Sequence, residues 1–451
     1  MVNNTITERD IFPKGYMKRL LVPLILEQFL AITIGLADTI MVSSSGEAAI
    51  SGVSLVDQIN ILLIQTFAAL ATGGAVIISQ YLGRGENKQA RHAAKQLTLI
   101  SFYVSAAIMA ICLIFCPQIL KWIFGTIEDD VMANCKIYFY TTVLSYPFLA
   151  LYNAASASFR AMGKSRVILV ISLFMNTINV AGNAIFIYGF GFGVFGAAFA
   201  TLISRIFGGI VMTVLMHNKN NEVYIEGLSK PALEYKLIKR ILYIGVPNGI
   251  ESGMFQVGKL LVSRVVSSLG TSAIAANAAA GTIATVSNIP GMAIGLALVT
   301  VVGKAMGAKL PDVAEKYTKR FVALTFLLMI IFNVVIFIFS GPIAGLFSLT
   351  EGAKADTVNI VKQFCIISSF TWPLAFTLPN CLRGAGDVKF TLAVSMLSMW
   401  LCRVALCYFL CLNMQMGIYG VWYAMYADWI FRIIFFVYRF AKGKWKTLTV
   451  V

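Results

Sequence analysis

The sequence has very little charge for its length. Asp, Glu, Lys and Arg make up only 12% of its 451 residues, whereas hydrophobic residues make up 59%. A water-soluble protein cannot bury that much apolar surface. The composition therefore excludes the soluble classes and predicts a polytopic membrane protein.

Motifs of several enzyme and metal-binding classes are also absent. The eight cysteines show no metal-ligand spacing with the two histidines, His92 and His217, so we interpret them as small apolar residues. No Walker loop is present, which excludes direct use of ATP and favours a downhill ion as the energy source. The polar N-terminal stretch has no apolar region or cleavage site of a signal peptide. We expect a protein that is not an enzyme and that has no cofactor.

Long apolar runs fill most of the chain. Most of them have the ~20 residues that a helix needs to cross the hydrocarbon of a bilayer. Twelve transmembrane helices are predicted, over residues 17–42, 53–80, 96–117, 135–158, 167–188, 194–216, 240–268, 277–304, 320–340, 358–380, 389–412 and 418–440.

The net charge of +16 follows the predicted topology. With the N-terminus inside, 27 of the 36 Lys and Arg residues lie in cytoplasmic segments, four lie on the opposite side and five lie within spans. Cytoplasmic loops of membrane proteins carry such an excess of basic residues. We therefore predict a multi-pass protein of the cell (inner) membrane with both termini cytoplasmic. The same distribution argues against nucleic acid as a partner and for the lipid bilayer.

The chain contains one unit written twice. Pro23-x-x-x-Glu27 returns 224 residues later as Pro247-x-x-x-Glu251. Shorter repeated elements pair Gly46 with Gly270, Arg160-x-x-Gly163 with Arg383-x-x-Gly386, and Gly193-x-x-Gly196 with Gly417-x-x-Gly420.

The duplication predicts the domain organisation. A long polar connector at 217–239 separates six spans from six others, so the halves enter the membrane from the same side. Such halves are parallel repeats about an axis along the membrane normal. We predict an all-α fold of two pseudo-symmetric six-helix lobes, with the N-lobe at 1–216 and the C-lobe at 240–451.

Acids inside the apolar spans are candidate functional residues, because a carboxylate inside a bilayer is expensive. Glu27 and Glu251 occupy the same depth in the two halves, so we expect them in a central substrate cleft. Burial as protonated, hydrogen-bonded acids is the alternative. Asp428 is a further cleft candidate, although Arg432 at i+4 also makes it one half of an ion pair.

A second polar group is expected in the outer half of the N-lobe. Asp38 lies almost three helical turns after Glu27 on the same face of the first span. Chain direction brings Asn179, Asn183 and Thr201 to the depth of Asp38. One carboxylate with amide and hydroxyl oxygens can hold Na⁺ or pass a proton. We predict that this group is an ion-coupling site. Hydrogen bonding between helices is the alternative for the asparagines, and it is favoured for Asn176, which is also a cleft candidate.

The order of these motifs resembles the MATE family, the multidrug and toxic compound extrusion transporters of the MOP superfamily. The resemblance covers nearly the whole chain. It is carried by the 224-residue repeat, the twelve spans and three motifs: Pro23 with Gly35-Leu-Ala-Asp38-Thr39, Asn179-x-x-x-Asn183 with Gly196-Ala-Ala-x-Ala-Thr201, and Leu382-Arg-Gly-Ala-Gly-Asp387.

The resemblance implies a mechanism. Its members export lipophilic, often cationic compounds in exchange for H⁺ or Na⁺, while two lobes alternate between inward- and outward-open states. It places the coupling site on Asp38, Asn179, Asn183 and Thr201, and helix bending on Pro23. Some members carry Asp where this chain has Asn183, and others carry an acid in helix 10, where this chain has Trp372-Pro373.

We therefore expect a monomeric multidrug efflux antiporter with its coupling site in the N-terminal half, because the second-half equivalent of Asp38 is Val262. Its partners are small lipophilic or cationic molecules. Two alternatives remain open. A lipid-linked oligosaccharide flippase of the same superfamily would have an Arg-lined cavity, against which the intramembrane acids weigh. A non-transporting membrane receptor would show no gradient-dependent flux.

Overall fold

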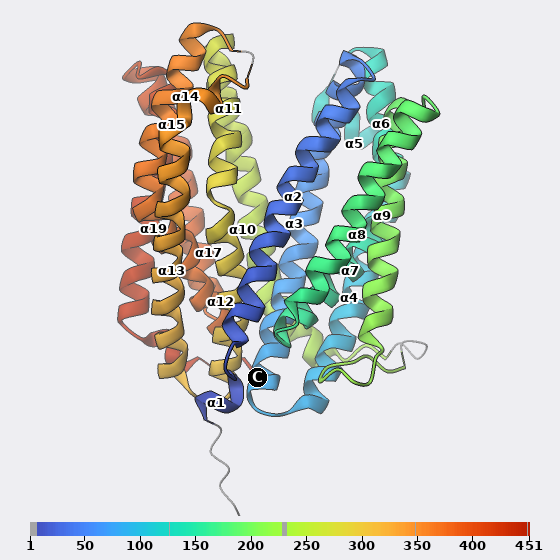
Figure 1. Ribbon diagram of the computed structural model, residues 1–451, viewed down its shortest axis with the longest axis vertical. Helices are drawn as coiled ribbons and strands as arrows, with labels where there is room; N and C mark the ends of the chain where they lie inside the picture. The colour runs from blue at the N-terminus through green and yellow to red at the C-terminus, as the bar shows by residue number, and fades with distance from the viewer. Residues whose placement is uncertain (1–6, 126, 228–231, 348, 449) are drawn as a thin grey trace, which may run out of the picture. The chain divides into compact units, whose positions relative to one another are not determined.

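The computed structural model describes residues 7–125, 127–227, 232–347, 349–448 and 450–451. Within these ranges the secondary structure is helical and contains no strand, which confirms the all-α prediction (Figure 1). The chain forms two compact units. We call them the N-unit, Phe12–Gly249 with Val451, and the C-unit, Ile250–Val450 with the stretch that ends at Ile11. The boundary lies inside helix α10. The predicted connector at 217–239 therefore lies in the N-unit, and the division of lobes at that connector stays a prediction.

The helices of the N-unit follow one another with short turns up to α9, and the long connector precedes α10. They are α2 (Tyr16–Ser43), α3 (Glu47–Gly83), α4 (Asn87–Ile114), α5 (Cys116–Phe124), α6 (Asp129–Val143), α7 (Tyr146–Ala161), α8 (Ser165–Asn183), the π-helix η1 (Ala184–Gly189), α9 (Gly193–Met216) and the first part of α10 (Tyr235–Ser268).

The C-unit contains the rest of α10 and the helices that follow it. These are α11 (Thr271–Ser287), α12 (Ile289–Gly307), α13 (Pro311–Ile338), α14 (Ser340–Ala344), α15 (Glu351–Trp372), the π-helix η2 (Pro373–Thr377), α16 (Pro379–Ala385), α17 (Val388–Leu397), the π-helix η3 (Ser398–Ala405), α18 (Leu406–Tyr408), the π-helix η4 (Phe409–Asn413), α19 (Gly417–Ala441) and the short 3₁₀ helix η5 (Lys444–Thr447). Helix α1 (Glu8–Ile11) also belongs to it.

Ten stretches within the described ranges are helical, long and apolar enough to cross a membrane. Nine of them match predicted spans, and the tenth, α12, matches only the second part of the predicted span 277–304, whose first part lies in α11. The other two predictions also fall on helices. The predicted span 135–158 is divided between α6 and α7, and the predicted span 240–268 lies within α10. Asn248, Glu251 and Gln256 make α10 more polar than the ten.

The two halves share the same turns. Gly46 before α3 and Gly270 before α11 have φ angles of 103° and 94°. Gly163 after α7 and Gly386 after α16 have φ angles of 76° and 94°. Only glycine adopts such positive φ angles readily, so the repeated glycines fix the chain's direction at equivalent joints. The duplication in the sequence is thus a duplication of structure.

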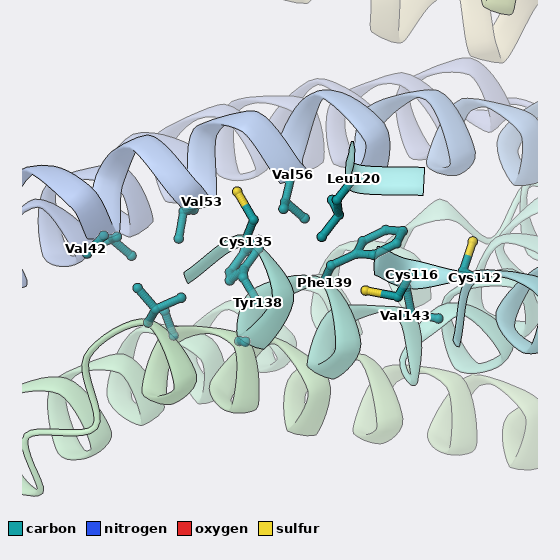
Figure 2. Close-up of a cluster of buried hydrophobic side chains, with 14 of the residues drawn as sticks. Val42, Val53, Val56, Cys112, Cys116, Leu120, Cys135, Tyr138, Phe139 and Val143 are labelled. Atoms are coloured by element: carbon teal, nitrogen blue, oxygen red, sulfur yellow. The ribbon is translucent and has the colours of Figure 1, made fainter. Parts of the chain in front are cut away.

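The core of the N-unit is apolar and contains three of the cysteines. Figure 2 shows Cys112, Cys116 and Cys135 among valine, leucine and phenylalanine side chains of α2, α3, α5 and α6. All three are buried and free of disulfides. They pack as small apolar residues, as the sequence interpretation expects.

Candidate functional site

The four predicted coupling residues meet in the N-unit, where α2 packs against α8. Asn179 and Asn183 lie one turn apart on α8, so both amides lie on the same side of the helix. The Asn183 Nδ2 donates to Asp38 Oδ1 at 2.6 Å. The Asn179 amide is satisfied when its nitrogen lies toward Asp38, where it donates to Oδ1 at 2.6 Å and to Oδ2 at 3.1 Å. In this orientation its oxygen accepts from Thr201 Oγ1 on α9 at 3.2 Å.

This donor set suits an ionised carboxylate. Amide N–H groups donate hydrogen bonds to both oxygens of Asp38. Hydrogen bonds to a charged acceptor are stronger than those between neutral groups. A cation such as Na⁺ requires oxygen ligands instead. The Asn183 Oδ1 is buried and has no hydrogen-bond partner among the described residues, so a rotation of that amide would offer one. Na⁺ would need amide oxygens turned toward Asp38, from Asn183 after this rotation or from Asn179 in the reversed orientation, in which its Nδ2 donates to Thr201 Oγ1 at 3.2 Å, whereas a proton needs Asp38 alone.

A polar network that the sequence interpretation missed lies beside Asp38. Asp57 accepts from Asn60 Nδ2 at 3.1 Å, and Asn60 Oδ1 accepts from Tyr146 at 2.7 Å. The guanidinium of Arg205 donates to Ser145 Oγ at 2.9 Å, and its charge acts on both Asp38 and Asp57. The spacing of Asp57 and Asn60 on one helical face was the available signal.

One of the two repeated glutamates, Glu251, forms an ion pair with an arginine, and the other, Glu27, is influenced by the charge of an arginine in its own unit. Arg383 Nη2 donates to Glu251 Oε1 at 2.6 Å, and its Nη1 donates to Asn380 Oδ1 at 3.0 Å. In the N-unit the charge of Arg160 acts on Glu27, whose Oε2 is buried without a hydrogen-bond partner among the described residues. The sequence shows both motifs twice, Pro-x-x-x-Glu and Arg-x-x-Gly. Only packing reveals that the two motifs contact each other in the C-unit, through Glu251 and Arg383.

The Glu251–Arg383 contact should appear as a coupling energy. The side chains are 14% and 18% exposed, so water screens the pair only partly. We expect Glu251→Gln and Arg383→Gln each to lower stability, and the double variant to lower it by less than their sum. The expected difference is about 0.5–3 kcal/mol. Unfolding in detergent measures it, and strict additivity would contradict the pairing.

Asp428 on α19 is completely buried between two arginines. Arg432 Nε donates to its Oδ1 at 2.9 Å, which confirms the i, i+4 ion pair. Arg403 Nη1 lies 3.6 Å from its Oδ2. The Arg432 Nη1 also donates to Ser395 Oγ at 3.1 Å. Asp428 is therefore a neutralised acid rather than a free carboxylate of a cleft.

The last two predicted residues lie on continuous helices. Asn176 Nδ2 donates to Ser172 Oγ at 3.4 Å, one turn earlier on α8, so it makes a hydrogen bond within its own helix rather than between helices. Pro23 lies inside α2, which runs unbroken from Tyr16 to Ser43. Its ring removes one backbone hydrogen bond and so weakens the helix one turn before Glu27.

Comparison with known proteins agrees with this arrangement. Residues 23–185 match the MatE family model, and residues 247–409 match it again, 224 residues later. Two curated relatives are the "Uncharacterized transporter YisQ" of Bacillus subtilis and a "Probable multidrug resistance protein NorM" of Thermotoga maritima. The first is 29% identical over 92% of this chain and 91% of its own length. The second is 26% identical over 96% of this chain and 93% of its own length.

A solved structure extends the likeness to the fold. It is the outward-facing conformation of a multidrug resistance MATE family transporter of the MOP superfamily, with a TM-score of 0.90 at 20% identity. The superposition covers 97% of both chains. Together the repeated family match and the two-unit helical fold identify this chain: it belongs to the MatE family of multidrug and toxic compound extrusion transporters.

Proposed function

We propose that this chain is a secondary-active exporter of lipophilic compounds, driven by exchange with a coupling ion that binds at Asp38. The observation that carries the proposal is the double amide contact to the Asp38 carboxylate, which joins α2 to α8. The names of the relatives, probable multidrug resistance proteins, support toxic lipophilic compounds as the substrate class.

The proposed coupling step is a change in the charge of Asp38. When Asp38 is ionised, the charge-assisted hydrogen bonds from Asn179 and Asn183 hold α2 against α8. A proton arriving from outside removes the charge and weakens these bonds. Helix α2 then bends more easily at Pro23, where a backbone hydrogen bond is missing. Alternating access requires such a bistable element whose balance the ion shifts.

We propose H⁺ rather than Na⁺ as the coupling ion, because N–H groups and not oxygens serve Asp38. We further propose that the protein is a monomer with both termini cytoplasmic. The substrate's charge is a separate question. Glu251 and Asp428 each contact arginine, and this leaves them little negative charge to attract a cation.

Transport in sealed proteoliposomes tests the proposal. We expect at least one of two fluorescent lipophilic compounds, one cationic and one anionic, to be moved against its gradient when a pH gradient is imposed, and neither when only a Na⁺ gradient is imposed. If one monovalent cation exchanges for one proton, the membrane potential cancels, although it is worth ~2.3 kcal/mol per charge at 100 mV. A potassium diffusion potential should then have little effect. Movement under the Na⁺ gradient alone would replace H⁺ by Na⁺, and no movement under either gradient would favour the receptor alternative.

A further inference from the structure

We propose that the C-unit binds the anionic group of a lipophilic compound, a carboxylate or sulfonate, between Arg403 and Lys259. This inference rests on the proposed export function, because it names the charge of the compounds that the protein recognises. It departs from the expectation of cationic substrates. Four independent features of the C-unit support it.

The first feature is an excess of positive charge. Among the described residues, Asp428 is the carboxylate that forms ion pairs with Arg432 and Arg403, and Arg432 binds it tightly at 2.9 Å. Arg403 lies further away, at 3.6 Å from the same carboxylate. Lys259 on α10 has no hydrogen bond or ion pair with any described residue, and the charge of Arg403 acts on it. Arg403 is only 14% exposed, so its incompletely compensated charge is costly unless an anion joins it, and the exposed Lys259 adds a second positive charge.

The second feature is the free bonding capacity of Arg403. A guanidinium has five N–H donors in a planar fork that matches a carboxylate. Among the described residues, Arg403 has only the distant carboxylate of Asp428 and the ring of Phe255, whose centroid lies 5.2 Å away. Its side chain is 14% exposed, so the donors are largely shielded from water.

The third feature is a close helix approach that brings the two cations together. Gly258 on α10 lies against Met399 of η3, and an added Cβ would collide with that side chain. Glycine therefore permits this approach. Phe255 and Lys259 lie on either side of Gly258 along α10, and Arg403 lies one turn after Met399. The contact thus holds one wall of the proposed site in place.

The fourth feature is a difference between the halves at this place. Gly163 and Gly386 are related by 223 residues, whereas Gly193 and Gly417 are related by 224, so the C-unit has one extra residue between these joints. The π-helix η3 lies in that interval, and the corresponding turns of α8 are α-helical. A π-turn accommodates a single inserted residue and is frequent at functional sites.

The two halves also differ in charge at this place. The turn of α8 that corresponds to η3 carries Asn179, which serves Asp38. In the C-unit the turn carries Arg403, and Val262 stands at the position of Asp38. The same location in the fold therefore holds a carboxylate in the N-unit and a cation in the C-unit. This pattern suits a protein that takes its coupling cation on one side and an anionic group on the other.

Binding of two probes to the full-length protein in nanodiscs tests the inference. The probes are 11-(dansylamino)undecanoic acid and 11-(dansylamino)undecylamine, which share a lipophilic body and carry opposite charges. In phosphatidylcholine nanodiscs we expect the carboxylate probe to bind at least about tenfold more tightly than the amine. Arg403→Gln and Lys259→Gln should each weaken the carboxylate probe by about ten- to a hundredfold and leave the amine unaffected.

Arg264→Gln is the matched control, because Arg264 is exposed on the same helix about 140° around from Lys259. It should change neither affinity. Arg403→Lys keeps the charge and removes the fork, so an intermediate affinity is expected. If Arg403→Gln fails to fold, Lys259→Gln on the accessible face of α10 still tests the site. Equal binding of both probes, tighter binding of the amine, or equal effects of the Lys259 and Arg264 variants would overturn the inference.

Two further arms separate the source of the anion from the proposed function. Competition by phosphatidylglycerol in the nanodisc would support the anion site and assign it to a lipid headgroup, whereas binding of the probe that phosphatidylglycerol does not reduce assigns it to a soluble compound. The binding assay uses no ion gradient. Selective anion binding without gradient-driven flux would therefore contradict the proposed function alone, and flux without anion selectivity would contradict this inference alone.

Discussion

Asp38→Asn is expected to abolish ion-coupled export while the protein stays folded. The substituted amide has nearly the shape of the carboxylate but cannot gain or lose a proton. It therefore cannot switch the hydrogen bonds that join α2 to Asn179 and Asn183 of α8. A pH difference of one unit is worth about 1.4 kcal/mol per proton, or about tenfold accumulation of an exchanged compound. The variant should lose this accumulation entirely in the proteoliposome assay.

Asp129→Asn is the matched control for this experiment. Asp129 is exposed in the first turn of α6, so the substitution removes the same charge without touching the network. It should transport like the wild type. Accumulation by Asp38→Asn equal to that of the control would remove Asp38 from the coupling mechanism, and unfolding of the variant would show up as an altered melting profile rather than as selective loss of coupling.

The coupling group in the N-unit could be predicted from sequence because local rules determine it. Helical periodicity puts Asn179 and Asn183 on one face of α8. Chain direction through the bilayer then gives each residue a depth, and Asp38 and Thr201 share that depth. The contact between Asp38 and the two amides is the geometry that these rules predict.

The partners of the other buried charges could not be predicted in the same way. Arg383 is 132 residues from Glu251, and Arg205 is 60 residues from Ser145. Such contacts depend on which helices pack together, and hydrophobic periodicity does not specify that. The repeat did contain a usable signal, because Glu and Arg recur together in both halves.

The structural differences between the two halves also could not be predicted from the hydrophobic pattern of the sequence. An apolar run predicts a helix but not whether one of its turns is α or π. The π-helix η3, and the position of Arg403 on it, therefore could not be predicted. The break between α6 and α7 was missed for a similar reason, since Leu144 and Ser145 lie within a run that remains apolar on both sides.

Asp428→Asn is expected to cause the largest loss of stability. The Asp428 side chain is completely buried and that of Arg432 is 4% exposed, so water solvates neither charged group. Without the carboxylate, Arg432 and Arg403 both lose their counter-ion. Breaking a buried pair by removing one partner costs about 3–5 kcal/mol, because an uncompensated charge is left behind. Thermal unfolding in detergent should show a correspondingly lower midpoint.

Two further variants make this test specific. Asp312→Asn removes a carboxylate that also binds a lysine, Lys446 at 2.9 Å, but the Asp312 side chain is 91% exposed. An exposed pair contributes only about 0–1 kcal/mol, so this variant should melt almost like the wild type. The double variant Asp428→Leu with Arg432→Met replaces the inner pair by apolar groups, and it should recover part of the loss, because only Arg403 then remains unpaired. If Asp428→Asn is as stable as Asp312→Asn, the buried charges must be neutralised by groups other than Asp428, and the charge excess inferred around Arg403 and Lys259 would be incorrect.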